Sequence, residues 1–315
     1  MLKVTVGIPS FNEEKNILNL LQSVIKQKSE HFAICEIIIS DDSSDDTIRL
    51  IEEFATNNSE AAIKCLHHSS RMGVANAWNE IFQNAKGDVI VMFDGDVIPH
   101  EDSIREMLGA LDGRVVLSIS NSEPTRSVSV AGRAATCVSS WLRSVRNKRL
   151  SQYTAIGRGL SIRTNIAKKI AIPSDIIAVD LYLECKVLEF KSDVAYTDRS
   201  VVYFCPPGTI ADFNSQVLRS LKGHKQIRHC IEKFNIRLPL EVALRQTVRV
   251  FLSDPLGALA VAACYSLLPY HKHRLKGLDS SKWHIAQSTK STRNFSINNP
   301  PSYTDMRPGR RSYRY

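Results

Sequence analysis

The sequence predicts an α/β fold built on a mainly parallel β-sheet with helices on both faces. From residue 3 to residue 96, apolar runs alternate with stretches of helical spacing, which is the order of strands and helices in such folds. The runs are continuously apolar, as expected for strands that are buried on both faces. With 315 residues, of which 43% are hydrophobic, the chain is long enough for one large domain with an appendage.

The predicted elements follow one another without long gaps. Residues 3–9 are expected to form the first strand, and residues 13–28 an amphipathic helix. The next elements are a strand at 34–40, a helix at 45–56, a strand at 62–67, a helix at 73–84 and a strand at 89–93. In open sheets of this kind, ligands bind outside the carboxyl ends of the strands.

Two aspartates, Asp94 and Asp96, follow the apolar run at 89–93 with only Gly95 between them. At the end of a buried strand their carboxylates repel each other, and a hard divalent cation relieves that repulsion while leaving positions open for phosphate oxygens. The pattern therefore indicates a metal–diphosphate site. An ordinary polar turn is the alternative, because Asp and Gly are common turn residues.

The seven cysteines are scattered and form no C-x-x-C pair. No charged and apolar leader precedes the first predicted strand, so we expect no secretory signal. In a reducing cytosol such cysteines are expected to be small apolar fillers, with neither a disulfide framework nor a zinc site. They occupy positions 35, 65, 137, 185, 205, 230 and 264.

Positive charge is concentrated in the last third of the chain. Residues 215–315 hold 18 lysines and arginines against 5 acidic residues, whereas the net charge of the whole chain is +9. A basic extension of this kind indicates contact with an anionic surface, and a solvated tail is the alternative. Lipid headgroups are favoured over nucleic acid, because no nucleic-acid-binding motif accompanies the charge and only 7% of residues are aromatic.

Four segments resemble, in sequence and in order, the motifs of glycosyltransferase family 2. They are residues 6–14 (VGIPSFNEE), 38–44 (IISDDSS), 71–79 (RMGVANAWN) and 93–96 (FDGD). The resemblance covers about residues 3–225. It implies a GT-A fold, a UDP- or GDP-linked sugar donor, a divalent cation that is Mg or Mn, and inversion at the anomeric carbon.

The first two motifs resemble the nucleotide-binding residues of the family. The second implies recognition of the base by Asp42, whose carboxylate can accept hydrogen bonds from ring N–H groups. Asp41 is expected to orient the loop. Capping of the following helix is the alternative for Asp41, Asp42 and Ser44. The first motif implies donor contacts by Pro9, Phe11 and Glu13.

The third motif contains Arg71, and the fourth contains Asp94 and Asp96. Arg71 resembles the residue that meets the nucleotide, since a guanidinium can stack on a base or bind phosphate, and a solvated surface arginine is the alternative. Trp78 lies on the apolar face of its predicted helix and is expected in the core. Asp96 resembles the direct metal ligand of the family, and Asp94 resembles its partner at the ribose or the metal.

An inverting transferase needs a base that takes the proton of the acceptor hydroxyl. In residues 178–184 (AVDLYLE), Asp180 resembles the aspartate of the family's E-D-x-x-L pattern, but Val179 replaces its acidic partner. A helix N-cap is the alternative for Asp180, and Asp175 is the reserve candidate for the base.

Two further segments resemble donor-binding motifs. Gly157 and Gly159 lie in GRGLSIR at 157–163, which is similar to a glycine-rich floor under the donor sugar, although an ordinary turn has the same spacing. Arg219 lies in QVLRS at 216–220, which resembles the Q-x-x-R-W motif of processive synthases with serine in place of tryptophan. Arg219, with Lys222, is expected at the diphosphate, and a surface helix is the alternative. The missing tryptophan favours limited transfer over polymerisation.

The remaining segments concern the acceptor and a surface. Residues 121–150 combine arginines with apolar residues at helical spacing, which indicates either an acceptor-binding segment or a solvated basic helix. Residues 255–270 contain no charged residue and are too short to span a bilayer, so they indicate an interfacial helix beside anionic lipid; a buried core or oligomer helix is the alternative.

The predicted organisation is therefore a GT-A domain at 1–225, a helical extension at 226–286, for which a membrane-interfacial position is one of the two alternatives, and a disordered basic tail at 287–315. The predicted function is a metal-dependent inverting glycosyltransferase, cytoplasmic and peripheral at the membrane face, with a glycan or lipid-linked acceptor. A nucleotidyltransferase is disfavoured, because no glycine-rich triphosphate loop lies between Ile8 and Lys15. A non-catalytic sugar-binding relative is the third hypothesis.

Overall fold

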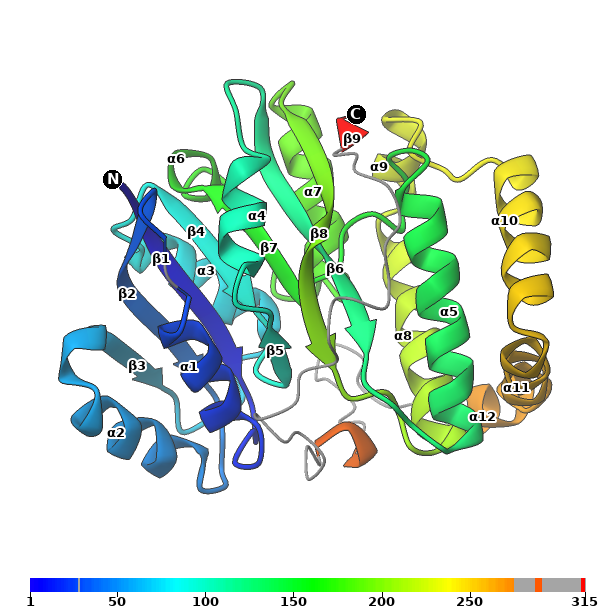
Figure 1. Ribbon diagram of the computed structural model, residues 1–315, viewed down its shortest axis with the longest axis horizontal. Helices are drawn as coiled ribbons and strands as arrows, with labels where there is room; N and C mark the ends of the chain where they lie inside the picture. Colours follow the sequence, from blue (N-terminus) through cyan, green and yellow to red (C-terminus); the bar gives the residue numbers. More distant parts are fainter. Residues whose placement is uncertain (28, 275–286, 291–312, 315) are drawn as a thin grey trace.

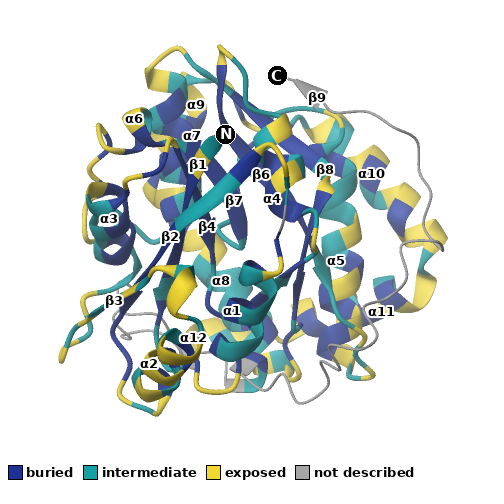
Figure 2. Ribbon diagram, turned by 60° about the vertical axis from the view of Figure 1, so that its left-hand side comes forward, coloured by how far each residue is buried: buried dark blue, intermediate teal, exposed yellow. Residues whose placement is uncertain are grey.

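The computed structural model describes residues 1–27, 29–274, 287–290, 313 and 314, and it contains a nine-stranded sheet between helices (Figure 1). The strands are ordered β3-β2-β1-β4-β7-β6-β8-β5, and β9 pairs with β8 beside that path. The sheet is mixed but mostly parallel, as the sequence predicts. In Figure 2 the strands are largely dark blue, because helices cover both faces of the sheet.

The first four long strands run in the same direction. They are β1 (Leu2–Ser10), β2 (Phe32–Asp41), β3 (Ile63–His67) and β4 (Val89–Phe93). The register places Ser10 opposite Asp41 and Gly7 opposite Met92. The loops that follow β1, β2 and β4 therefore leave the sheet along one edge, which brings the predicted motifs together.

The second half of the sheet contains the antiparallel strands. β7 (Gly159–Arg163) lies antiparallel between β4 and β6 (Val115–Pro124), and β8 (Asp193–Phe204) is parallel to β6. Two short strands, β5 (Val97–Pro99) and β9 (Tyr313–Arg314), pair antiparallel with opposite ends of β8.

Helices on each face bury a separate apolar cluster against the sheet. On one face lie α1 (Ile17–Ile25), α2 (Thr47–Asn57) and α4 (Ser103–Gly109). On the other face lie α3 (Val74–Asn84), α6 (Thr164–Ala167) and α7 (Val179–Glu189). Trp78 of α3 is 1% exposed, so its predicted core position is confirmed. A short 3₁₀ helix, η1 (Ser59–Ala61), precedes β3.

The predicted boundaries agree with the structure within two residues, except at the first helix. That helix was expected at 13–28, but α1 begins at Ile17. The carbonyl of Glu13 accepts hydrogen bonds from the amides of both Asn16 and Ile17, and Asn12 has a left-handed φ of 53°. The chain therefore turns between β1 and α1, and periodicity alone does not show such a turn.

Further helices form a layer beside the β6–β8 end of the sheet (Figure 1). α11 packs on α5 through small residues, among them Ala131, Ala134, Ala260 and Cys264, and its other side is exposed. The helices are α5 (Val130–Arg146), α8 (Ile210–Gln226), α9 (Arg228–Lys233), α10 (Leu240–Ser253), α11 (Pro255–Ser266) and α12 (Leu268–Arg274).

Within the described ranges, no single helix is both long and apolar enough to cross a membrane. Leu240–Ser253 and Pro255–His273 meet that test only as a pair, and the pair is bent by 118°. Of the tail that was predicted to be disordered, residues 291–312 and 315 lie outside the described residues. Gln287–Lys290 form the 3₁₀ helix η2.

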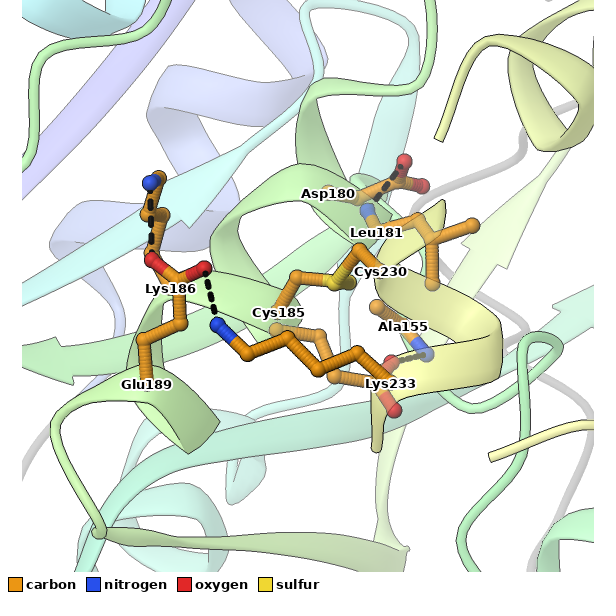
Figure 3. Close-up of a disulfide and its surroundings, with 9 residues drawn as sticks. Ala155, Asp180, Leu181, Cys185, Lys186, Glu189, Cys230 and Lys233 are labelled. Carbon is orange, nitrogen blue, oxygen red and sulfur yellow. Dashed lines mark hydrogen bonds and ion pairs between the residues drawn. A yellow bond between two sulfur atoms is a disulfide. The ribbon is translucent and has the colours of Figure 1, made fainter. Parts of the chain in front are cut away.

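The prediction that every cysteine is an apolar filler is wrong for two of them. Cys185 of α7 and Cys230 of α9 form a disulfide, with their Cα atoms 6.2 Å apart (Figure 3). The two helices meet in a buried cluster that contains Leu181, Ile227 and Ile231, and this packing brings cysteines 45 positions apart into bonding range. Cys35, Cys65, Cys137, Cys205 and Cys264 are not in a disulfide.

Removal of the disulfide is expected to destabilise the fold. The double variant Cys185→Ala/Cys230→Ala should lower the free energy of unfolding by about 2–4 kcal/mol, because the bridge limits the freedom of the unfolded chain. Guanidinium unfolding of non-reduced protein measures this, and Cys35→Ala, which removes a free thiol, is the matched control. Equal midpoints for the double variant and the wild type would contradict the expected contribution.

Candidate active site

Asp94 and Asp96 leave the carboxyl end of β4 and lie against the loop that follows β1. A Cβ atom on Gly95, between them, would stand 2.8 Å from Cγ of Glu13 and 3.5 Å from the carbonyl oxygen of Pro9. Only glycine allows this close approach. The Asp-Gly-Asp segment is therefore packed into the site and is more than a solvent-exposed turn.

The two aspartates form a repulsive pair. Burial, followed by the negative charge of Asp96, raises the pKa of Asp94 to about 7, and the positive charges of Arg158 and Arg219 oppose that rise. A divalent cation fits this donor set, since oxygen ligands suit Mg and Mn and the cation would offset the repulsion. Across the described residues, no group of three or more His, Cys, Asp or Glu side chains forms a closed metal cage. Two carboxylates would thus leave coordination positions for phosphate.

Arg158 was missed as a site residue in the sequence, although it lies between the two glycines that were singled out. Its guanidinium stacks on the ring of Phe204 at 3.5 Å from the centroid. Burial lowers its pKa, while Asp96 and then Asp94 act in the opposite direction. The charge of Arg219, on α8, acts on Asp94 and on Arg158. The site therefore contains two arginines close to its acidic pair.

Asp180 lies in the first turn of α7 and faces the same place. Its Oδ2 accepts a hydrogen bond from the amide of Gly157 at 2.9 Å. A Cβ on Gly157 would be 3.7 Å from Oδ1 of Asp94 and 4.0 Å from Oδ2 of Asp180, so oxygens of both acids lie beside this glycine. The N-cap alternative is wrong, because Ala178 occupies that position. Gly159 begins β7 opposite Phe93.

Of two further ionisable residues, Asp175 lies at the surface, whereas His224 lies where the charge of Asp180 acts on it. The reserve candidate Asp175 is exposed and accepts hydrogen bonds from the side chain of Gln226. His224 of α8, which the sequence did not single out, lies where the charge of Asp180 acts on it. Burial lowers the pKa of His224, which favours its neutral form at neutral pH. Its ring contacts Tyr153 at 5.2 Å between centroids.

Asp42 organises the loop in front of α3. Its Oδ2 accepts hydrogen bonds from the amides of Met72 and Gly73 at 2.8 and 2.9 Å, and Oδ1 lies 3.2 Å from Nδ1 of His68. Capping of α2 by Asp42 or Ser44 is wrong, because the N-cap is Asp46. The carboxylate of Asp42 therefore fixes the backbone next to Arg71.

Arg71 and Phe11 meet across that loop. The guanidinium carbon of Arg71 is 4.1 Å from the ring centroid of Phe11, and burial lowers the pKa of Arg71. Arg71 is thus half-buried and stacked on an aromatic ring, and its contact with the nucleotide stays a prediction. Glu13 is buried, and its amide donates to Oγ1 of Thr47 while its carboxylate accepts from Asn16. Glu13 thus holds the turn after β1 in place.

Asp41 orients its loop as predicted. Its carboxylate accepts hydrogen bonds from the amide of Ser43 at 3.1 Å and from the hydroxyl of Ser43.

Lys222 is exposed on α8, beyond Arg219. The tail reaches the same edge of the sheet, because the hydroxyl of Ser288 accepts from the amide of Gly208 at 3.0 Å and donates to Asp212.

The arginines of residues 121–150 do not form one open binding surface. Arg143 is paired with Asp198 at 2.7 Å and with Glu123 at 2.9 Å, and Arg146 is fully buried. These two cations belong to the packing of α5 on the sheet. Arg126, Arg133 and Lys148 are exposed, so a basic contact with an acceptor in this segment falls to these three.

Comparison with known proteins identifies the family. A family model described as glycosyl transferase family 2 matches residues 5–167. The chain is 31% identical over 121 residues to the hyaluronan synthase of Streptococcus pyogenes, covering 36% of this chain and 28% of that protein. It is 27% identical over 111 residues to the uncharacterized glycosyltransferase YfnE of Bacillus subtilis, covering 35% of this chain and 27% of that protein. The matches thus span less than a third of these relatives.

Solved structures show the same fold. The mannosyltransferase PcManGT from Pyrobaculum calidifontis, in complex with GDP-Man and Mn2+, superposes with a TM-score of 0.59 at 18% identity, over 91% of this chain and 84% of that one. S. aureus TarS 1-349, in complex with UDP-GlcNAc, superposes with a TM-score of 0.52 at 17% identity, over 93% and 92% of the two chains. Because the family model matches more than half of its residues and the fold is GT-A, the chain belongs to glycosyltransferase family 2.

Proposed function

We propose that the protein is a metal-dependent, inverting glycosyltransferase that moves a sugar from a UDP- or GDP-linked donor to a glycan or lipid-linked acceptor. One observation carries the proposal: carboxylate oxygens of Asp94 and Asp180 lie beside the same residue, Gly157, and the charges of Asp96, Arg158 and Arg219 act on Asp94. A cation-binding, diphosphate-neutralising group and a base are the two parts that an inverting transfer needs.

In the proposed reaction, Asp180 takes the proton of the acceptor hydroxyl while that oxygen attacks the anomeric carbon of the donor. The bond from the anomeric carbon to the diphosphate oxygen breaks in the same step on the opposite side of the ring, so the configuration inverts. The electron pair stays on the nucleoside diphosphate, which Arg158 and Arg219 face. Asp94 and Asp96 would hold a divalent cation, which supplies Lewis-acid neutralisation of the same diphosphate.

The nucleotide is proposed to lie on the β1–β2 side of the site. Phe11 and Arg71 offer a stacking pair, and the loop that Asp42 fixes offers polar groups to the base. Two proteins of the same fold support this class of donor, since one was solved with GDP-Man and Mn2+ and the other with UDP-GlcNAc.

We further propose peripheral contact at the cytoplasmic membrane face through α10 and α11. Leu244 of α10 is 56% exposed, and Leu259 of α11 is 67% exposed. Arg249 and Arg245 are also exposed along α10; Arg245 is paired with Glu241 at 2.7 Å, so these three residues leave one net positive charge beside the apolar side chains, as expected for binding to anionic lipid. The exposed apolar residues of the two helices are Leu240, Leu244, Val248, Phe251, Leu252, Leu256, Leu259 and Tyr265.

The variant Asp96→Asn tests the metal assignment. Release of nucleoside diphosphate from a panel of nucleotide sugars, with and without a polyprenyl-phosphate acceptor, should depend on Mg or Mn in the wild type. In the variant it should fall at least about a hundredfold, because one anionic ligand is lost. Asp88→Asn is the matched control, since Asp88 lies before β4 at the other end of the strand and bonds the amide of Lys3. Full metal-dependent activity in Asp96→Asn would refute the assignment.

The variant Leu244→Glu/Leu252→Glu tests the membrane contact. The affinity of this variant for vesicles that contain anionic phospholipid, measured by co-sedimentation, should be about tenfold lower than that of the wild type. Two acidic side chains replace exposed apolar ones and are repelled by the negative surface. Phe190→Glu, which changes an exposed apolar residue after α7, should bind as the wild type does. Failure of the wild type to bind such vesicles would exclude the proposed surface.

A further inference from the structure

Two carboxylates of α7 hold the same loop. Asp180 and Glu184 lie one helical turn apart and therefore share one side of the helix. Oδ2 of Asp180 accepts from the amide of Gly157 at 2.9 Å, and Oε2 of Glu184 accepts from the amide of Ala155 at 3.0 Å. The loop at 155–157 is thus fastened to α7 at two points.

This loop sets the spacing of the site. Gly157 lies beside both Asp94 and Asp180, and the next residue, Arg158, lies where the charges of Asp96 and Asp94 act on it. A shift of the loop would move the amide that Asp180 binds and the cation that opposes the acidic pair. Small displacements of reacting groups lower rates strongly, because the reaction depends on alignment.

Glu184 itself is fully buried, and none of the described residues forms a hydrogen bond to its Oε1. The charged groups that act on it are Asp180 on the same helix and Arg146 on α5. Burial is the largest cause of a rise in its pKa to about 8; Asp180 adds to the rise, and Arg146 and the amide of Ala155 oppose it. At neutral pH the neutral acid therefore predominates and adds no second negative charge beside Asp180.

We propose that Glu184 is a positioning residue for sugar transfer, which holds the loop at 155–157 against α7 and so fixes where the Asp180 carboxylate stands relative to Asp94. The inference rests on the function proposed above, because that function makes Asp180 the base. Packing alone does not account for the residue, since an apolar side chain would fill the same space without leaving a buried oxygen without a partner.

Glu184→Gln and Glu184→Leu separate positioning from packing. In Glu184→Gln, the side-chain oxygen of glutamine can still accept the hydrogen bond from the backbone amide of Ala155, and the side chain carries no charge. The kcat at pH 7 should therefore stay within about threefold of the wild type. Leucine removes the acceptor, and kcat should fall at least about tenfold while KM for the donor changes by less than about threefold. Thermal unfolding of each variant is measured in parallel.

The pH profile supplies a readout that a purely structural residue would not change. As pH rises through about 8, Glu184 ionises in the wild type, and a buried anion with one unbonded oxygen should disturb the loop and lower kcat. Because an amide does not ionise, this alkaline loss should be absent in Glu184→Gln. If the variant keeps the same alkaline loss, the proposed role of Glu184 is wrong.

Amide hydrogen exchange tests the loop directly. Exchange at Ala155 and Gly157 should accelerate in Glu184→Leu and not in Glu184→Gln. Glu36→Leu is the matched control. Glu36, on β2, is also buried, and its carboxylate accepts hydrogen bonds from the amide of Lys86 at 2.6 Å and from the hydroxyl of Thr5. It should lower the unfolding temperature without changing the pH profile or exchange at 155–157.

The outcomes distinguish the positioning role of Glu184 from the proposed transferase function. Wild-type kcat in Glu184→Leu, or unchanged exchange at 155–157, overturns the positioning role while the transferase function stands. If the wild type releases no nucleoside diphosphate from any nucleotide sugar, the proposed function fails, and the positioning role fails with it. A slow Glu184→Leu variant with faster loop exchange supports the inference.

Discussion

Repulsion between two carboxylates in a poorly hydrated place is the constraint on which the candidate site depends. Asp94 and Asp96 end a buried strand one residue apart, and the pKa of Asp94 is raised to about 7 as a result of burial and of that neighbour. Asp180 adds to this negative charge, whereas Arg158 and Arg219 offset it and other neighbours fix the geometry of the pair. Gly95 allows the segment to pack on Glu13, and the loop after residue 155 brings Arg158 to one side. The antiparallel strand β7 makes this possible, because it starts at Gly159 directly opposite Phe93.

The features that the sequence predicts well are those encoded in short stretches. The apolar run before Asp94 is a strand with the predicted bounds, and the helix with Trp78 buries that side chain as its spacing requires. Motif order also placed Asp180 close to Asp94, although these residues are far apart in the chain. The start of α1 was misplaced, because it depends on hydrogen bonds to the carbonyl of Glu13, which periodicity does not encode.

The features that the sequence did not predict arise from contacts between distant segments. Arg143 and Arg146 contribute to a basic stretch, yet one is paired with Asp198 and Glu123 and the other is buried, so neither is available to an acceptor. Charge counts along a chain cannot show such pairing. Glu184 gave no signal either, since its significance comes from the amide of Ala155 and from complete burial. Asp42 was expected at a base, and in the structure its oxygens hold the loop beside Arg71.

The bridge between Cys185 and Cys230 makes the oxidation history of a sample part of its chemical identity. One cysteine follows Glu184 on α7, the helix that carries Asp180, and the other lies on α9. Beside the bridge, Glu189 of α7 pairs with Lys186 of the same helix and with Lys233 of α9 (Figure 3). Glutathione keeps most cytosolic thiols reduced, whereas bridges persist in oxidising compartments. Protein purified with a reducing agent and protein purified without one are therefore two covalent species. A thiol titration of freshly lysed cells would reveal which of them the cell makes, and hence the redox environment in which the chain matures.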